Sequence, residues 1–100
     1  MQDVFVVTAL EWDGDWIFRA EVGEANPDSN VWKSPPKAIS LNELMELIER
    51  PNTLVTSRTR SGTSGPNLMV HIGLRGQRTV QAIRIPGALQ NLDSIASLIK

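Results

Sequence analysis

The stretch Ser40-Leu41-Asn42-Glu43-Leu44-Met45-Glu46-Leu47-Ile48-Glu49-Arg50, residues 40–50, contains the clearest structural signals of the chain. Ser40 precedes Glu43 by three positions, which is the spacing of a capping box at the start of a helix. The apolar residues follow the i, i+3, i+4, i+7 spacing of one buried helical stripe: Leu41, Leu44, Met45 and Ile48. Pro51 follows and disfavours the α conformation at Arg50. These features predict a helix over Ser40–Arg50 with one buried face.

Two segments before this helix predict a β-hairpin. Val4–Leu10 and Trp16–Val22 are rich in β-branched and aromatic residues. The Asp-Gly step at positions 13 and 14 is typical of a tight type I′ turn, and this turn pairs Leu10 with Ile17. Six apolar residues then share the face that we assign to the core: Phe5, Val7, Ala9, Phe18, Ala20 and Val22. A second apolar set on the opposite face needs a cover: Val4, Val6, Leu10 and Ile17.

The rest of the chain adds a connector, three strands and a second helix. Glu24–Pro36 ends in two prolines, whose missing N–H groups predict a loop or an extended connector, and Trp32 is expected to tether it to the core. Three strands are expected: Leu54–Thr59, Leu68–Leu74 and Thr79–Ile85. Asn91 can cap a short helix over Leu92–Ile99.

The resulting order, β-β-α-β-β-β-α, predicts an α+β fold with a mainly antiparallel five-stranded sheet and the main helix packed on one face. One hundred residues predict a single domain over residues 1–100, because a second core would need more chain. The sequence has no cysteine, which excludes disulfides, thiolate metal sites and cysteine nucleophiles. No apolar run approaches the ~20 residues of a membrane-spanning helix, and no export signal is visible. We therefore expect a cytoplasmic protein with no membrane partner.

The charges are distributed unevenly along the chain, although the formal net charge is only -1. Residues 1–50 contain ten acidic and four basic side chains, whereas residues 51–100 contain one acidic and six basic ones. The simplest expectation is that the two halves neutralise each other across one core.

The basic second half suggests an anion-binding face. A tight turn at Gly76-Gln77 would place Arg75 opposite Arg78, turn Ile72 and Leu74 toward the main helix and put the arginines of the last two strands, together with His71, on the other side. Pairing of Val55 with Ile72 would add Arg58 and Arg60 to that side. The candidate binding residues are Arg58, Arg60, His71, Arg75, Arg78 and Arg84. The planar guanidinium group suits phosphate and carboxylate. Nucleic acid is possible but not favoured, because no aromatic residue follows Trp32 that could stack on bases.

A second candidate site surrounds the first turn, at Trp12-Asp13-Gly14-Asp15-Trp16. Two indoles beside Asp13 and Asp15 could bind a sugar ring or a cationic ligand through stacking and cation–π attraction. The alternative interpretation is structural, with the turn formed by Asp-Gly and the tryptophans in contact across the strands. His71 is the only histidine, and a half-exposed strand position explains it better than catalysis does.

The uncovered apolar side chains of the first hairpin favour an interaction surface. The main functional prediction is a small non-enzymatic interaction or regulatory module that binds a protein partner or associates with itself as a homodimer. The alternative is binding of an anion or a nucleic acid through the arginine face, and the third possibility is a small ligand near Trp12 and Trp16. No catalytic residue, metal or cofactor is predicted.

Three pieces of the chain have a familiar pattern. They are the strand-turn-strand Val6–Ala20, the residues Trp32, Ala38-Ile39-Ser40 and Leu47-Ile48 around the start of the helix, and the terminal Asn91-Leu92-Asp93-Ser94-Ile95. This layout resembles a bacterial family of small uncharacterised domains. The Glu24–Pro36 segment and the Ser61–Asn67 loop depart from the compact pattern of that family. The resemblance implies no activity, ligand or catalytic residue.

Overall fold

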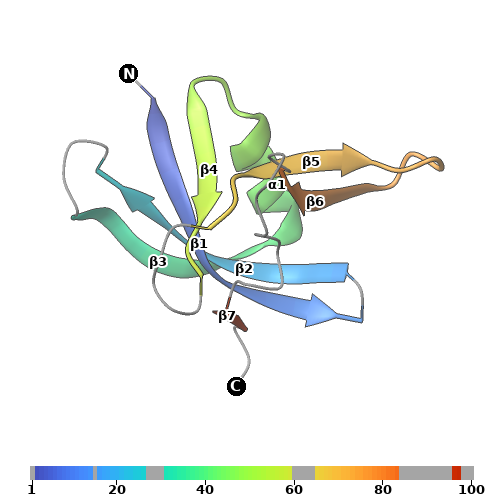
Figure 1. Cartoon of the computed structure of the whole chain (residues 1–100), viewed down its shortest axis with the longest axis horizontal. Helices are drawn as coiled ribbons and strands as arrows, with labels where there is room; N and C mark the ends of the chain where they lie inside the picture. Colours follow the sequence, from blue (N-terminus) through green and yellow to red (C-terminus); the bar gives the residue numbers. More distant parts are fainter. Residues whose placement is uncertain (1, 15, 27–30, 60–64, 84–95, 98–100) are drawn as a thin grey trace.

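The computed structural model describes residues 2–14, 16–26, 31–59, 65–83 and 96–97. The elements follow one another along the chain as β1 (Asp3–Asp13), β2 (Trp16–Ala25), β3 (Trp32–Ser40), α1 (Leu41–Glu49), β4 (Thr53–Ser57), β5 (Leu68–Ile72), β6 (Arg78–Ala82) and β7 (Ala96–Ser97) (Figure 1). The strands form a main sheet and a separate two-stranded sheet made of β5 and β6.

The main sheet has the strand order β3-β2-β1-β4 and is mixed. β2 runs antiparallel to both β1 and β3, whereas β4 runs parallel to β1 and places Val55 opposite Phe5. α1 connects β3 to β4, which run in the same direction and therefore need such a crossover. The predicted α+β class is confirmed. The prediction of one mainly antiparallel five-stranded sheet is wrong, because the β5–β6 pair forms a separate sheet and the main sheet is mixed.

Helix α1 forms where the capping signals predict it. The Ser40 hydroxyl accepts a hydrogen bond of 3.2 Å from the backbone N–H of Glu43. At the other end, the N–H of Arg50 donates to the carbonyl of Leu47 in front of Pro51. Leu44 and Met45 are buried, so the helix uses the predicted stripe to pack against the sheet. α1 also contacts the β5–β6 pair and thus joins the two sheets.

One hydrophobic core contains residues from both sheets and from the helix. Its buried members are Val7, Leu10, Ile17, Ala20, Val22, Ile39, Leu44, Met45, Val55, Leu68 and Val80. Phe5, Leu41, Leu47, Ile48 and Val70 are partly buried against this cluster. Ser57 is the buried polar side chain in the described part of the chain, and its hydroxyl donates a hydrogen bond of 2.6 Å to the carbonyl of Pro66.

The first hairpin forms, but its pairing and its faces differ from the prediction. Leu10 pairs with Ala20 rather than with Ile17, and Ile17 pairs with Trp12. The ladder contains two irregularities, one at Thr8 in β1 and one at Phe18 in β2. Each extra residue reverses the alternation of side chains beyond it. As a result Leu10 and Ile17 enter the core, whereas Phe18, which we assigned to the core, is 55% exposed.

The second apolar face of the first hairpin is covered in two ways. Of the four residues that needed a cover, Leu10 and Ile17 turn inward. Val6 is buried and lies opposite Gly23. The six-membered ring of Trp32 lies directly over Gly23, since a Cβ atom added there would be 2.6 Å from Cζ3 of Trp32. Trp32 therefore covers the face of the sheet opposite α1.

The segment before the helix is a strand and not the predicted connector. Trp32–Ser40 pairs with β2 along its length, with irregular register near Pro35 and Pro36. A proline cannot donate to a ladder, but β3 lies at the edge of the main sheet, where strand prolines are tolerated. The expected tether is present in Trp32, which packs on the sheet from the first position of β3.

The second hairpin also has a register different from the predicted one. Ile72 pairs with Arg78 and Val70 with Val80, so the connection spans residues 73–77 instead of a two-residue turn at Gly76-Gln77. This shift by an odd number of residues places Val80 on the face of Val70 and not on the face of His71. The predicted pairing of Val55 with Ile72 is likewise wrong, because β4 and β5 belong to different sheets.

At the end of the described chain, Ala96 and Ser97 form β7 and pair in parallel with Ala9 and Leu10 of β1. The predicted helix over Leu92–Ile99 is therefore wrong at these two positions, and its other residues lie outside the described ones. Within the part of the chain that the structure describes, no helix has the length and apolar character needed to span a membrane.

Candidate functional site

The described arginines of the predicted binding face lie in different parts of the molecule. Arg58 follows β4 in the main sheet, and its guanidinium carbon is 5.3 Å from the centre of the Trp32 ring. Arg75 lies in the connection between β5 and β6, where its backbone N–H donates to the side chain of Gln77. Arg78 forms an ion pair with Glu49 of α1. Arg60 and Arg84 lie outside the described residues. No single face therefore contains all three of Arg58, Arg75 and Arg78. Anion binding by these residues stays a prediction.

The register of the β5–β6 pair explains why Arg78 leaves the predicted face. Arg78 is opposite Ile72, on the side of Val70 and Val80, which is the side that packs against α1. From this position its side chain meets Glu49 at the end of the helix. His71 is exposed on the opposite side, across from Thr79. It therefore occupies the solvated strand position that the structural interpretation favoured.

The candidate site at the first turn is described only in part. Trp12 is partly exposed near the end of β1, and Asp13 pairs with Trp16 in the last rung of the hairpin. Gly14 has a φ of 61°, so the turn uses the conformational freedom that the Asp-Gly step indicated. Asp15 and the side chain of Trp16 lie outside the described set. Ligand binding at Trp12 and Trp16 stays a prediction.

No metal site is formed by the described residues, among which no group of three histidine or carboxylate side chains could hold an ion. Three ion pairs join described side chains. Arg19 pairs with Glu11, and Lys33 pairs with Glu24, so both of these pairs lie within residues 1–50. Arg78 and Glu49 form the one pair between the acidic and the basic half of the described chain. Within the described residues, the acidic and the basic half thus neutralise each other through a single ion pair.

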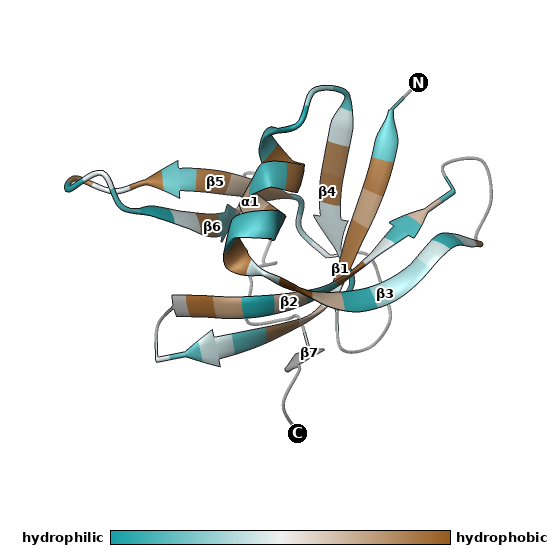
Figure 2. Ribbon diagram, turned by 180° about the vertical axis from the view of Figure 1, so that it is seen from behind, coloured by the Kyte–Doolittle hydropathy of each residue, from teal (hydrophilic) through white to brown (hydrophobic). Residues whose placement is uncertain are grey.

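The structure exposes an apolar surface that the sequence analysis missed. The β5–β6 hairpin, defined as residues 68–82, projects from the body of the molecule beyond α1 (Figure 1). Ile72 is 65% exposed at its far end, Leu74 is fully exposed in the connection, and Met69 is partly exposed. Figure 2 shows hydrophobic positions along β5 as far as its end. We expected Ile72 and Leu74 to face the main helix, because a two-residue turn would have kept both in a longer strand.

Comparison with protein-family models, with curated proteins and with solved structures finds no match for the chain. The resemblance to a family of small bacterial domains therefore stays a prediction.

Proposed function

We propose that the chain is a non-enzymatic interaction module that forms a homodimer through the β5–β6 hairpin. In this dimer, the end of the hairpin of one copy lies against the acidic, outward side of helix α1 of the other copy, which carries Glu46. The observation that most supports the proposal is the exposure of Ile72 and Leu74 at the end of a projecting hairpin.

The exposed apolar side chains of the hairpin have a cost in free energy. Transfer of a leucine or isoleucine side chain from water to a buried position stabilises by about 1.5–3 kcal/mol. Ile72 and Leu74 receive little of this stabilisation within one copy, because both are largely in contact with water. Exposed apolar residues clustered in this way are typical of protein–protein interfaces. Burial of both side chains against a second protein would supply the driving force for association.

The distribution of charge favours a second copy of the chain as the partner. Residues 68–82 contain Arg75 and Arg78 and no acidic residue, whereas residues 1–50 have a large excess of carboxylates. The described ion pairs leave Arg75 on the hairpin and Glu46 on α1 without an opposite charge in contact. A second copy therefore presents an acidic surface to the basic hairpin. The reciprocal contact would close the pair with two-fold symmetry, as most homodimers do.

Sedimentation equilibrium of the full chain from micromolar to near-millimolar concentration tests the proposal. We expect the average mass to rise with concentration toward twice that of the monomer. Leu74→Asp places a charge in the proposed contact and should raise the dimer dissociation constant at least about tenfold. Phe18→Asp is the matched control, because Phe18 is similarly exposed but belongs to β2. It should leave the dissociation constant unchanged.

Two results would contradict the proposal. A monomer mass at every concentration would exclude the homodimer, and equal weakening by Phe18→Asp would exclude the hairpin as its interface. If the chain is a monomer that binds duplex DNA, single strands or RNA with strong salt dependence, the anion-binding alternative replaces the proposal.

A further inference from the structure

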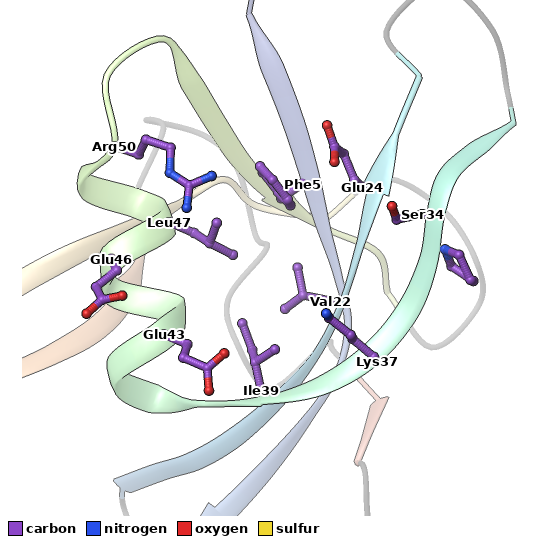
Figure 3. A pocket seen from close by; sticks show the side chains of 11 residues that line it. Phe5, Val22, Glu24, Ser34, Lys37, Ile39, Glu43, Glu46, Leu47 and Arg50 are labelled. Atoms are coloured by element: carbon purple, nitrogen blue, oxygen red, sulfur yellow. The ribbon is translucent and has the colours of Figure 1, made fainter.

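A pocket of about 300 Å³ lies between α1 and the inner side of the main sheet (Figure 3). One wall comes from the second half of α1, with Leu47 and Arg50, and the opposite wall comes from β3, with Ser34 and Lys37. The crossover from β3 through α1 to β4 borders this space, because α1 contacts β2 and β4 while β3 curves beneath the helix (Figure 3). The pocket does not involve the β5–β6 hairpin.

The inner surface of the pocket is apolar. It is formed by Phe5 of β1, Val22 of β2, Ile39 of β3 and Leu47 of α1. Val22 and Ile39 are buried members of the core, and Phe5 and Leu47 pack against it. These four side chains have fixed neighbours on four elements, so the apolar surface is already formed without a ligand. Such a preformed apolar surface with a few polar groups at its rim is typical of small-molecule sites.

Two cationic side chains point into this space. In Figure 3 the guanidinium group of Arg50 points toward Phe5, and the amine of Lys37 points toward Val22. Neither cation forms an ion pair with a described carboxylate. Arg50 is held at this position by its role as the last residue of the helix cap, where its backbone N–H binds the carbonyl of Leu47.

The three carboxylates of the pocket are placed differently. Glu24 forms an ion pair of 3.4 Å with Lys33, which neutralises it. Glu46 points away from the apolar surface in Figure 3. Glu43 lies beside Ile39 and belongs to the capping box with Ser40. An anionic ligand group is therefore repelled at the Glu43 end and attracted at the Arg50 end, which gives the ligand one preferred orientation.

We infer that this pocket binds a small organic carboxylate with an apolar body. The carboxylate accepts hydrogen bonds from Arg50, and the apolar body lies on Phe5, Val22 and Leu47. Arginine suits this task, because its planar group can donate two parallel hydrogen bonds to one carboxylate. A volume of about 300 Å³ lies at the lower end of the range of small-molecule sites, which suits a small ligand.

Titration of the full chain with 3-phenylpropanoate or octanoate, followed by NMR of the backbone amides, tests the inference. We expect saturable shifts at Phe5, Leu47 and Arg50 in the millimolar range or below. The alcohol and the amine with the same phenylpropyl body should bind at least about tenfold more weakly, because they lack the charge-assisted hydrogen bonds to Arg50. Equal affinity for carboxylate and amine, or shifts that never saturate, would overturn the inference.

Variants locate the site. Arg50→Gln should lower the affinity for the carboxylate at least about tenfold while it leaves the weak affinity for the alcohol unchanged. A merely structural role of Arg50 would lower both affinities alike. Arg19→Gln is the matched control, because Arg19 pairs with Glu11 on the first hairpin and does not line the pocket. An unchanged affinity for the carboxylate in Arg50→Gln, or a loss in Arg19→Gln as large as in Arg50→Gln, would contradict the assignment.

Discussion

Gly23 shows at the scale of one residue how the face opposite α1 is closed. A Cβ atom at this position would lie 2.6 Å from one ring carbon of Trp32 and 2.8 Å from another. These distances are far below an ordinary van der Waals contact between carbon atoms. The same ring lies 5.3 Å from the guanidinium carbon of Arg58, so Trp32 lies between the strand beneath it and a cation from the opposite edge of the sheet.

Gly23→Ala should therefore destabilise the chain by about 1–3 kcal/mol, because the added methyl group forces the Trp32 ring or the β3 backbone to move. Urea denaturation measures the free energy of unfolding. In a Trp32→Leu background the same substitution should cost clearly less, which gives a positive coupling between the two positions. Additive effects of the two substitutions would show that the ring does not occupy the space above Gly23.

The bulges at Thr8 and Phe18 explain which core residues sequence analysis could predict. Val7, Ala20 and Val22 were predicted correctly, because alternation holds on their side of each irregularity. Leu10 and Ile17 were not, because one extra residue reverses the faces. The hydroxyl of Thr8 donates a hydrogen bond of 2.7 Å to the Glu21 carboxylate, so the bulged residue has its own partner. A Thr–Glu contact of this kind depends on the pairing and leaves no local sequence signal.

At the scale of elements, the β3-α1-β4 crossover determines both the topology and the pocket. The helix was predicted almost to the residue, because its cap and its apolar stripe are local signals. β3 was missed, because two prolines argue against a strand and the edge position that permits them is a tertiary property. Without β3 there was no reason to expect β4 to run parallel to β1. The walls of the pocket could not be foreseen for the same reason.

Ser40→Ala should destabilise the chain by about 1 kcal/mol, since the backbone N–H of Glu43 loses its hydroxyl acceptor. Thermal or urea unfolding followed by circular dichroism measures the change. Ser40→Asp keeps an acceptor at the cap and should retain most of the stability. Ser34→Ala is the control, because Ser34 is an exposed serine of the same strand outside the cap, and it should change stability by less than about 0.5 kcal/mol. A loss from Ser34→Ala equal to that from Ser40→Ala would contradict the capping role.

For the whole molecule, the arrangement of charge matters more than the net charge of -1. The acidic half, residues 1–50, includes the first hairpin of β1 and β2, together with β3 and α1. The basic half, residues 51–100, includes the projecting β5–β6 hairpin. The asymmetry is visible in the sequence, but the fold decides whether the opposite charges meet. In the described residues they meet at Arg78 and Glu49, and Arg75 lies farther out in the hairpin connection. The charges that do not meet within one copy are those available to a second copy.

Salt should therefore weaken the proposed homodimer. We expect its dissociation constant to rise several-fold between about 50 mM and 500 mM sodium chloride, because the screening length falls below the distance between partly exposed charges. Sedimentation equilibrium at the two concentrations measures the effect. Arg75→Gln should reduce the dependence on salt, whereas Arg19→Gln should not, because Arg19 pairs with Glu11 within one copy. A dimer that tightens with salt would indicate an interface that is apolar alone.

The prolines of β3 have a consequence for the behaviour of the protein at high concentration. Sheets polymerise when an outer strand offers its N–H groups to another chain, and Pro35 and Pro36 leave a gap in that row. Fibre growth from this side of the molecule is thereby hindered, although β3 is a long strand at the edge of the sheet. The chain can thus expose apolar side chains on the β5–β6 hairpin without becoming prone to aggregate through the edge of its main sheet.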